Sequence, residues 1–179
     1  IDSPRLDLKA NPLYEDTDFA YFDTHYYGGI KKYQWTTIPL AFHGVIVKKD
    51  GTKIDVNIGE SDDDPVFCVT DLLPHLASEQ MKKNASNLIE GEALDVLIGN
   101  MPLKGKDKEG VKANVLSILK EKYDISEDDF LSSEIEVVPA GCARDMGLDK
   151  SMVLSYGQDD RSCAYSSLMA ILNAEVTDK

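Results

Sequence analysis

The pattern of hydrophobic and polar positions predicts one β-hairpin more clearly than any other element of the chain. Residues 53–58 read Lys-Ile-Asp-Val-Asn-Ile, so their apolar side chains all fall on one face of an extended strand. An apolar run at residues 45–47 precedes them, and Asp50 and Gly51 lie between the two runs. An Asp-Gly pair supplies the positive φ that a tight hairpin turn needs. We therefore predict a hairpin over residues 39–59.

Shorter runs predict four further strands. In residues 134–137 glutamates alternate with Ile135 and Val137, and Pro139 is expected to end that strand. Residues 1–9 also alternate apolar and polar side chains. The remaining strands are predicted from the apolar runs at 94–98 and 153–156, and residues 141–152 are predicted to form a loop.

Apolar residues spaced three and four positions apart predict helices. Ser78 can cap a first helix that ends before Gly91, and its apolar face comprises Met81, Ala85, Leu88 and Ile89. A second helix carries Val111, Val115, Ile118 and Leu119, and a last helix over residues 162–174 carries Ala164, Leu168, Ile171 and Leu172. Ser126, followed by three acidic residues, predicts the first turn of a short helix.

The order of these elements predicts an α+β fold. Residues 20–153 form a β-rich part with inserted helices. Residues 1–19 contain a strand, and residues 154–179 contain a strand followed by a helix, so both resemble pieces of an α/β domain. We therefore expect residues 20–153 to be a domain inserted between those two pieces.

Composition and charge exclude several classes of protein. Hydrophobic residues make up 42% of the 179 residues, which is enough for a packed core. The net charge of −13 argues against a nucleic acid as partner, because nucleic acids bind basic surfaces. No apolar run approaches the roughly 18–20 residues that span a bilayer, so no membrane partner is expected. Three cysteines without a CxxC pair indicate a reducing compartment, and hence a cytoplasmic location.

The turn from Tyr156 to Arg161 places two carboxylates, Asp159 and Asp160, behind Gly157 and before the last predicted helix. A carboxylate on a tight turn can bridge two metal ions, because its short side chain stays where the backbone puts it. The alternative is that Asp159 or Asp160 caps the helix. The local sequence by itself favours capping, so a metal-binding role needs support from elsewhere in the chain.

Other candidate motifs give weaker signals. His25, His43 and His75 share no HxH or HxxxH spacing, and a catalytic zinc takes about three protein ligands, so the local sequence favours a hydrogen-bonding role for each. The acidic residues in 60–64 lack the spacing of a calcium loop and are interpreted as solvated. The pair Gly28–Gly29 marks a turn or a close approach of the backbone, but no phosphate-loop motif and no GxSxG nucleophile motif are present.

Five short segments, taken in order, resemble the aspartyl aminopeptidase family of dinuclear zinc exopeptidases, and most closely its bacterial branch. They are DSPRL at 2–6, THYYGG at 24–29, VIV at 45–47, LPHLA at 73–77 and GQDDR at 157–161. Each segment is short, and their common order carries the resemblance. It covers nearly the whole chain.

The resemblance implies an architecture and a set of roles. Residues 20–153 would be a dimerisation domain inserted into an α/β zinc-peptidase domain, and the homodimers would assemble into a dodecamer. Asp159 would bridge two zinc ions, and Asp160 would be joined to it by a cis peptide bond. Asp2 would orient a zinc-binding histidine. His75 would reach into the active site of the partner subunit, where it could stabilise the oxyanion or the substrate, a peptide that loses its N-terminal residue.

The chain also departs from the family pattern. A Glu-Glu pair, which supplies the general base and a zinc ligand, is expected beyond Asp159, where the only acids are Asp160, Glu175 and Asp178. The chain starts at Ile1 without an initiator methionine or a signal peptide. We therefore expect an internal fragment of a zinc aminopeptidase that is inactive alone. Two alternatives stay open: a non-catalytic oligomerisation module, and a binding domain unrelated to peptidases in which Asp159 caps a helix.

Overall fold

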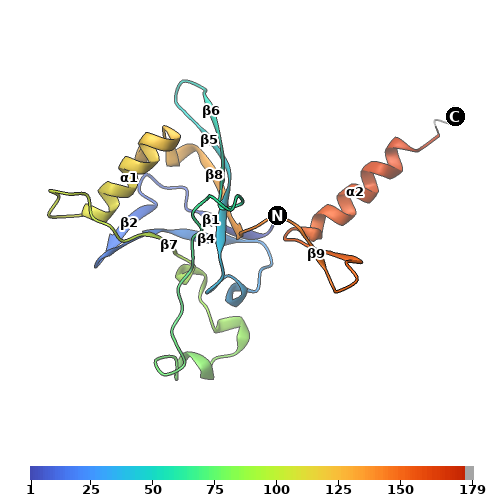
Figure 1. The fold of residues 1–179 in the computed structure, drawn as a ribbon, viewed down its shortest axis with the longest axis horizontal. Coiled ribbons are helices and arrows are strands. Elements are labelled where there is room, and N and C mark those ends of the chain that lie inside the picture. The colour runs from blue at the N-terminus through green and yellow to red at the C-terminus, as the bar shows by residue number, and fades with distance from the viewer. Residues whose placement is uncertain (176–179) are drawn as a thin grey trace. The chain divides into compact units, whose positions relative to one another are not determined.

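The computed structural model describes residues 1–175, so Asp178 lies outside the described part of the chain. The chain divides into two compact units, which are described separately (Figure 1). The larger unit comprises Asp2–Gly141, and the smaller comprises Ile1 together with the residues from Cys142 onward. The predicted domain boundaries at residues 19 and 153 remain a prediction. Within residues 1–175, no helix is long and apolar enough to cross a bilayer.

An antiparallel sheet of five strands forms the centre of the larger unit, in the order β4-β1-β8-β5-β6. In that order the strands are Thr24–Tyr27, Ser3–Leu6, Ser133–Pro139, Leu40–Val47 and Lys53–Ile58. β5 and β6 form the predicted hairpin, with Ile46 opposite Ile54, and Gly51 has the positive φ, 86°, that the turn requires. The strands predicted in residues 1–9 and 134–137 are confirmed as β1 and β8.

A smaller antiparallel sheet packs against helix α1 in the same unit (Figure 1). Its strands, in the order β2-β3-β7, are Leu13–Asp16, Phe19–Phe22 and Val96–Gly99, and α1 spans Gly110–Tyr123. The Lys112 amide in the first turn of α1 donates a hydrogen bond of 2.8 Å to the Glu15 carboxylate of β2. This bond satisfies one of the amides that a helix start leaves unpaired, and it ties α1 to the sheet. The second predicted helix and the strand predicted at 94–98 are confirmed.

Aromatic side chains join the two sheets. Phe130 is 1% exposed, and its ring lies edge-on to Phe22, with 5.4 Å between the ring centroids. Phe22 contacts Phe42 of β5 in the same way, at 5.5 Å. The indole of Trp35 donates a hydrogen bond of 2.9 Å to the Val137 carbonyl of β8. Rings in such edge-on contacts stabilise a core beyond the area that they bury, so this cluster stabilises the packing of the two sheets.

The predicted helix over residues 78–90 is wrong. The segment between β6 and β7 contains only short 3-10 helices: Gln80–Lys82 (η2), Ala85–Asn87 (η3) and Gly91–Ala93 (η4). Side chains such as Asn84 and Ser86 compete with a helix for the backbone hydrogen bonds. The expected apolar face is not buried as one surface either, since Met81 is 65% exposed while Ile89 is 7% exposed.

The two remaining 3-10 helices lie elsewhere in the larger unit. η5 spans Glu127–Ser132, and its predicted start is confirmed by a capping box, in which the Ser126 side chain accepts a hydrogen bond from the Asp129 amide and Asp129 Oδ2 accepts one of 2.8 Å from the Ser126 amide. The Ser126 hydroxyl also donates a hydrogen bond of 2.6 Å to Asp129 Oδ2. η1 spans Lys32–Gln34. The capping box was predictable because it depends only on residues three positions apart.

Ion pairs fasten the end of α1 to the β5–β6 hairpin. Asp124 follows α1 in the left-handed conformation, with φ 54°, and pairs with both Lys120 and Lys48. The hydrogen bonds from Lys120 and Lys48 lower the pKa of the Asp124 carboxyl from 3.8 to about 2. They do so because they favour the charged form.

Up to residue 175, the smaller unit contains a hairpin and one helix. Strand β9 (Arg144–Met146) pairs with β10 (Met152–Leu154), and α2 spans Gln158–Leu172. The loop predicted over 141–152 is therefore wrong in part, because β9 lies within it. The turn between β9 and β10 contains Gly147, whose φ is 89°. The last predicted strand and the last predicted helix are confirmed as β10 and α2.

Replacing Phe130 by alanine is expected to lower the free energy of unfolding by about 3–5 kcal/mol, because truncation of a buried ring removes contacts and leaves a cavity. Leu131 is the matched control, since it is adjacent in sequence but 56% exposed. Its alanine variant should change the free energy of unfolding by less than about 0.5 kcal/mol. Urea unfolding followed by circular dichroism measures both. Equal losses would contradict a core centred on Phe130.

The low pKa of Asp124 predicts a contribution to stability that depends on pH. Because this pKa is lower in the folded chain than in the unfolded one, the contribution is fully present above the unfolded value of 3.8 and is lost as pH falls towards about 2. Asp124→Asn removes the charge, and asparagine tolerates the left-handed conformation. Urea unfolding between about pH 6 and pH 2 should show a steeper loss of stability for the wild type than for the variant. Parallel pH profiles would contradict the prediction.

Candidate functional site

The turn that carries Asp159 and Asp160 opens helix α2. Gly157 occupies the N-cap position with φ 81°, and the Arg161 guanidinium donates a hydrogen bond of 3.3 Å to the Tyr156 carbonyl across the turn. Asp159 departs from helical geometry, with φ −91° and ψ 114°, and its peptide bond to Asp160 is cis, as the family resemblance implies. Asp159 therefore has the extended backbone typical of an N-cap residue, and the continuous helical geometry of α2 begins only after it, so the backbone is compatible with the capping alternative.

Asp2 lies in the larger unit, directly before β1. Its Oδ2 accepts a hydrogen bond of 2.7 Å from the Gly29 amide, and Gly28, with φ 80°, packs against the same carboxylate. This link was not predicted from the sequence. The feature of the sequence that could have revealed this contact is the pair Gly28–Gly29, because glycines mark positions where the backbone approaches another group closely.

His75 lies in the long segment between β6 and β7, at a turn where the Leu76 amide donates a hydrogen bond of 2.9 Å to the Leu73 carbonyl. Its imidazole is exposed, and within residues 1–175 it has no hydrogen bond or ion pair. Leu72 and Leu76 are 55% and 67% exposed. The hydrogen-bonding role that the local sequence favoured for His75 is therefore not found in the described part of the chain.

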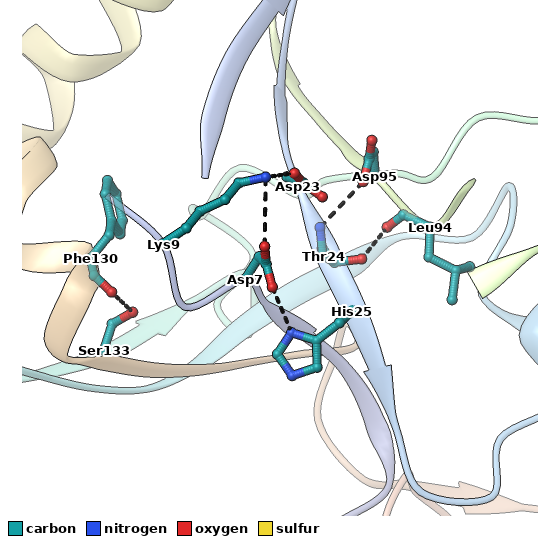
Figure 2. A network of polar contacts seen from close by, with 9 residues as sticks. All are labelled: Asp7, Lys9, Asp23, Thr24, His25, Leu94, Asp95, Phe130 and Ser133. Carbon is teal, nitrogen blue, oxygen red and sulfur yellow. Dashed lines mark hydrogen bonds and ion pairs between the residues drawn. The ribbon is translucent and has the colours of Figure 1, made fainter. Parts of the chain in front are cut away.

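The other two histidines have carboxylate partners. His43 of β5 has its Nε2 2.8 Å from Oε1 of Glu60, which confirms the expected hydrogen-bonding role. His25 of β4 has its Nδ1 3.3 Å from Oδ1 of Asp7 (Figure 2). Asp7 also lies 3.6 Å from the Lys9 ammonium group. Both imidazoles thus belong to local polar networks of the larger unit.

Asp95 joins three segments beside His25. Its Oδ1 accepts a hydrogen bond of 3.2 Å from the Thr24 amide, and the Thr24 hydroxyl donates one of 2.8 Å to the Leu94 carbonyl (Figure 2). Its Oδ2 accepts a hydrogen bond of 2.6 Å from the Tyr14 phenol. Burial, and then this hydrogen bond, raise the pKa of Tyr14, so the phenol stays protonated at neutral pH. The network is therefore structural.

The described side chains do not form a metal site by themselves. Within residues 1–175, no group of three His, Cys, Asp or Glu side chains could hold a metal ion. A catalytic zinc needs about three protein ligands, so a carboxylate at the α2 turn has the right chemistry but too few companions among these residues. In the acidic loop, Asp64 accepts hydrogen bonds of 3.1 Å from the amides of Ser61 and Gly59, which lower its pKa. That carboxylate shapes the loop.

The chain matches known proteins along its whole length. The model of the family described as aminopeptidase I zinc metalloprotease (M18) matches residues 1–179. A relative from Clostridium acetobutylicum, named probable M18 family aminopeptidase 1, is 66% identical over 100% of this chain and 39% of its own length. A relative of the same name from Thermotoga maritima is 57% identical over 97% of this chain and 38% of its own length. The chain thus spans about two-fifths of the length of these curated relatives.

Solved structures confirm the α+β fold. An M18-family aminopeptidase from Thermotoga maritima has a TM-score of 0.86 and 55% identity, and the match covers 97% of this chain and 38% of the solved chain. Aminopeptidase I from Clostridium acetobutylicum has a TM-score of 0.85 and 64% identity, and the match covers 99% of this chain and 39% of the solved chain. The mApe1 dodecamer of S. cerevisiae shares only the fold, with 15% identity and a TM-score of 0.58. That match covers 96% of this chain and 36% of the solved chain.

Proposed function

The chain belongs to the aminopeptidase I zinc metalloprotease family (M18), and we propose that it is part of a longer zinc-dependent enzyme that removes N-terminal residues from peptides. The observation that carries this proposal is the turn at the start of α2, where Asp159 and Asp160 are both exposed behind Gly157. In a zinc protease, a carboxylate on such a turn suits a bridge between two metal ions.

We propose that Asp159 bridges two zinc ions in each active site of the complete protein. The other ligands and the general base would come from residues outside this chain, which covers 39% of the Clostridium acetobutylicum relative. Asp2 would orient a histidine ligand, and Asp160 would hold Asp159 in place. Peptide hydrolysis is therefore assigned to the complete protein, and the isolated chain should be inactive.

We also infer that residues 20–153 are a dimerisation domain, and that His75 reaches the active site of the partner subunit. The supporting observation is its exposed imidazole, which lies among exposed leucines and has no hydrogen-bond partner within residues 1–175. Clustered apolar side chains at a surface are typical of protein–protein contacts, and a second copy would bury them. A distant member of the same fold is a dodecamer, so we propose that the homodimers assemble further.

A non-catalytic oligomerisation module is the second candidate, and the exposed leucines around His75 favour it. Helix α2, in contrast, favours a place within a catalytic domain, because Leu168 and Ile171 of its predicted apolar face are 53% and 76% exposed. Such a face suits packing within a larger α/β domain. The two candidate functions are compatible if this chain forms the oligomer contacts and contributes one bridging ligand, while the rest of the protein contributes the other ligands and the general base.

The complete protein should hydrolyse an aminoacyl-p-nitroanilide in the presence of zinc. Asp159→Asn should lower kcat/KM by at least about a hundredfold, because loss of a metal ligand costs no less than loss of a group that only orients one. Asp145→Asn, which changes an exposed carboxylate of β9, is the control and should leave kcat/KM unchanged. Hydrolysis by the isolated chain at the rate of the complete protein would contradict the assignment.

Mixing two inactive variants tests whether His75 acts across the dimer. His75→Ala and Asp159→Asn should each be impaired as homodimers. In a mixed dimer, one site would contain Asp159 and receive His75 from the other chain, so an equal mixture should recover about a quarter of the wild-type activity. If His75 serves its own subunit, every site lacks one of the two groups, and mixing recovers nothing. Steady-state rates before and after subunit exchange distinguish these results.

A further inference from the structure

The Gly28–Gly29 turn holds the Asp2 carboxylate in one place, and we propose that this turn is a positioning device on which the aminopeptidase activity depends. The inference rests on the proposed function, because it takes Asp2 as the acid that orients a residue of the active centre. It makes Gly28 and the Gly29 amide positioning groups. They act through Asp2 and do not contact the substrate.

Strand pairing brings Asp2 to the turn. β1 and β4 are antiparallel, with Ser3 opposite Tyr27 and Pro4 opposite Tyr26. The next position of this register, just beyond both strands, sets Asp2 opposite Gly28. The contact between segments 27 positions apart is therefore fixed by the sheet.

The carboxylate occupies the space that a side chain at residue 28 would need. A methyl group added to Gly28 would lie 2.0 Å from Cγ and 2.0 Å from Oδ1 of Asp2, far inside the contact distance of about 3.5 Å. The Gly29 amide donates its hydrogen bond of 2.7 Å to Oδ2. The turn thus both packs against the carboxylate and hydrogen-bonds to it, which sets its orientation.

The backbone around this contact is anchored. The Arg5 guanidinium of β1 lies over the Tyr27 ring of β4, 4.0 Å from its centroid. The same group donates hydrogen bonds of 2.7 Å to Glu134 and 3.1 Å to Glu136 of β8. Because the strands are held together, a clash at residue 28 is relieved most cheaply by rotation of the short Asp2 side chain. A substitution there should displace the carboxylate and leave the sheet intact.

A turn glycine with no further role is the alternative. The φ of Gly28, 80°, favours glycine by itself, so a loss of stability on substitution would not separate the two explanations. Gly51 offers a matched control within the same unit. Its φ is 86°, but a methyl group there would meet no atom within 4 Å. Substitution by alanine carries the same conformational cost at both glycines, and only the substitution at residue 28 also produces a clash with Asp2.

The test compares Gly28→Ala with Gly51→Ala in the complete protein, by steady-state hydrolysis of an aminoacyl-p-nitroanilide and by thermal unfolding. Both variants should lower the midpoint of unfolding to a similar extent, because both force alanine into the left-handed region. Gly28→Ala should also reduce kcat by about tenfold to a hundredfold with little change in KM, since a displaced orienting group impairs the reaction more than binding. Gly51→Ala should keep the wild-type kcat.

A double-mutant cycle with Asp2→Ala shows whether Gly28 acts through Asp2. In the Asp2→Ala protein, Gly28→Ala should cause little further loss of kcat, because the carboxylate that it displaces is gone. Equal kcat for Gly28→Ala and Gly51→Ala, or the same fold loss from Gly28→Ala in both backgrounds, would overturn the inference and leave the proposed function standing. An inactive wild-type protein would overturn the proposed function, and the inference with it.

Discussion

The pairing of β1 with both β4 and β8 closes the larger unit, and the rest of that unit depends on it. β1 has only four residues, yet its Arg5 binds Glu134, 129 positions later in the chain. Closing so long a loop costs entropy before any contact forms, so a short strand needs strong contacts. Leu6, 1% exposed, and the ion pairs of Arg5 supply them. The same register carries Asp2 to the Gly28 turn, and thereby links the fold to the proposed activity.

Elements that depend on neighbouring residues could be predicted from the sequence. The β5–β6 hairpin follows from alternation and the glycine at residue 51, and the capping box follows from Ser126 and Asp129. Elements that depend on distant partners could not. The apolar spacing of residues 78–90 suits a helix, but those side chains face different surroundings, with Ile89 buried and Met81 exposed. Strand β9 was missed because it is three residues long and exposed, and its pairing with β10 is not visible in its local sequence.

The candidate site was predictable only in part. Asp159 is ambiguous in its local sequence, and a metal-binding role is predicted only from the order of the family motifs. The match over the whole chain confirms the family, and the role of Asp159 stays a prediction. The exposed position of His75 could not be predicted, because it depends on which surfaces surround the turn at residues 73–76, and no local pattern gives these. The contact between Asp2 and Gly28 depends on strand register, which connects residues that no local pattern relates.

A bridging role for Asp159 is the claim on which the proposed function rests. Crystals of the complete protein with zinc, measured at the zinc absorption edge, test it most directly. We predict two anomalous peaks about 3.5–4 Å apart, with the Asp159 carboxylate between them. Two zinc ions bound away from Asp159 in crystals of the active enzyme would contradict it.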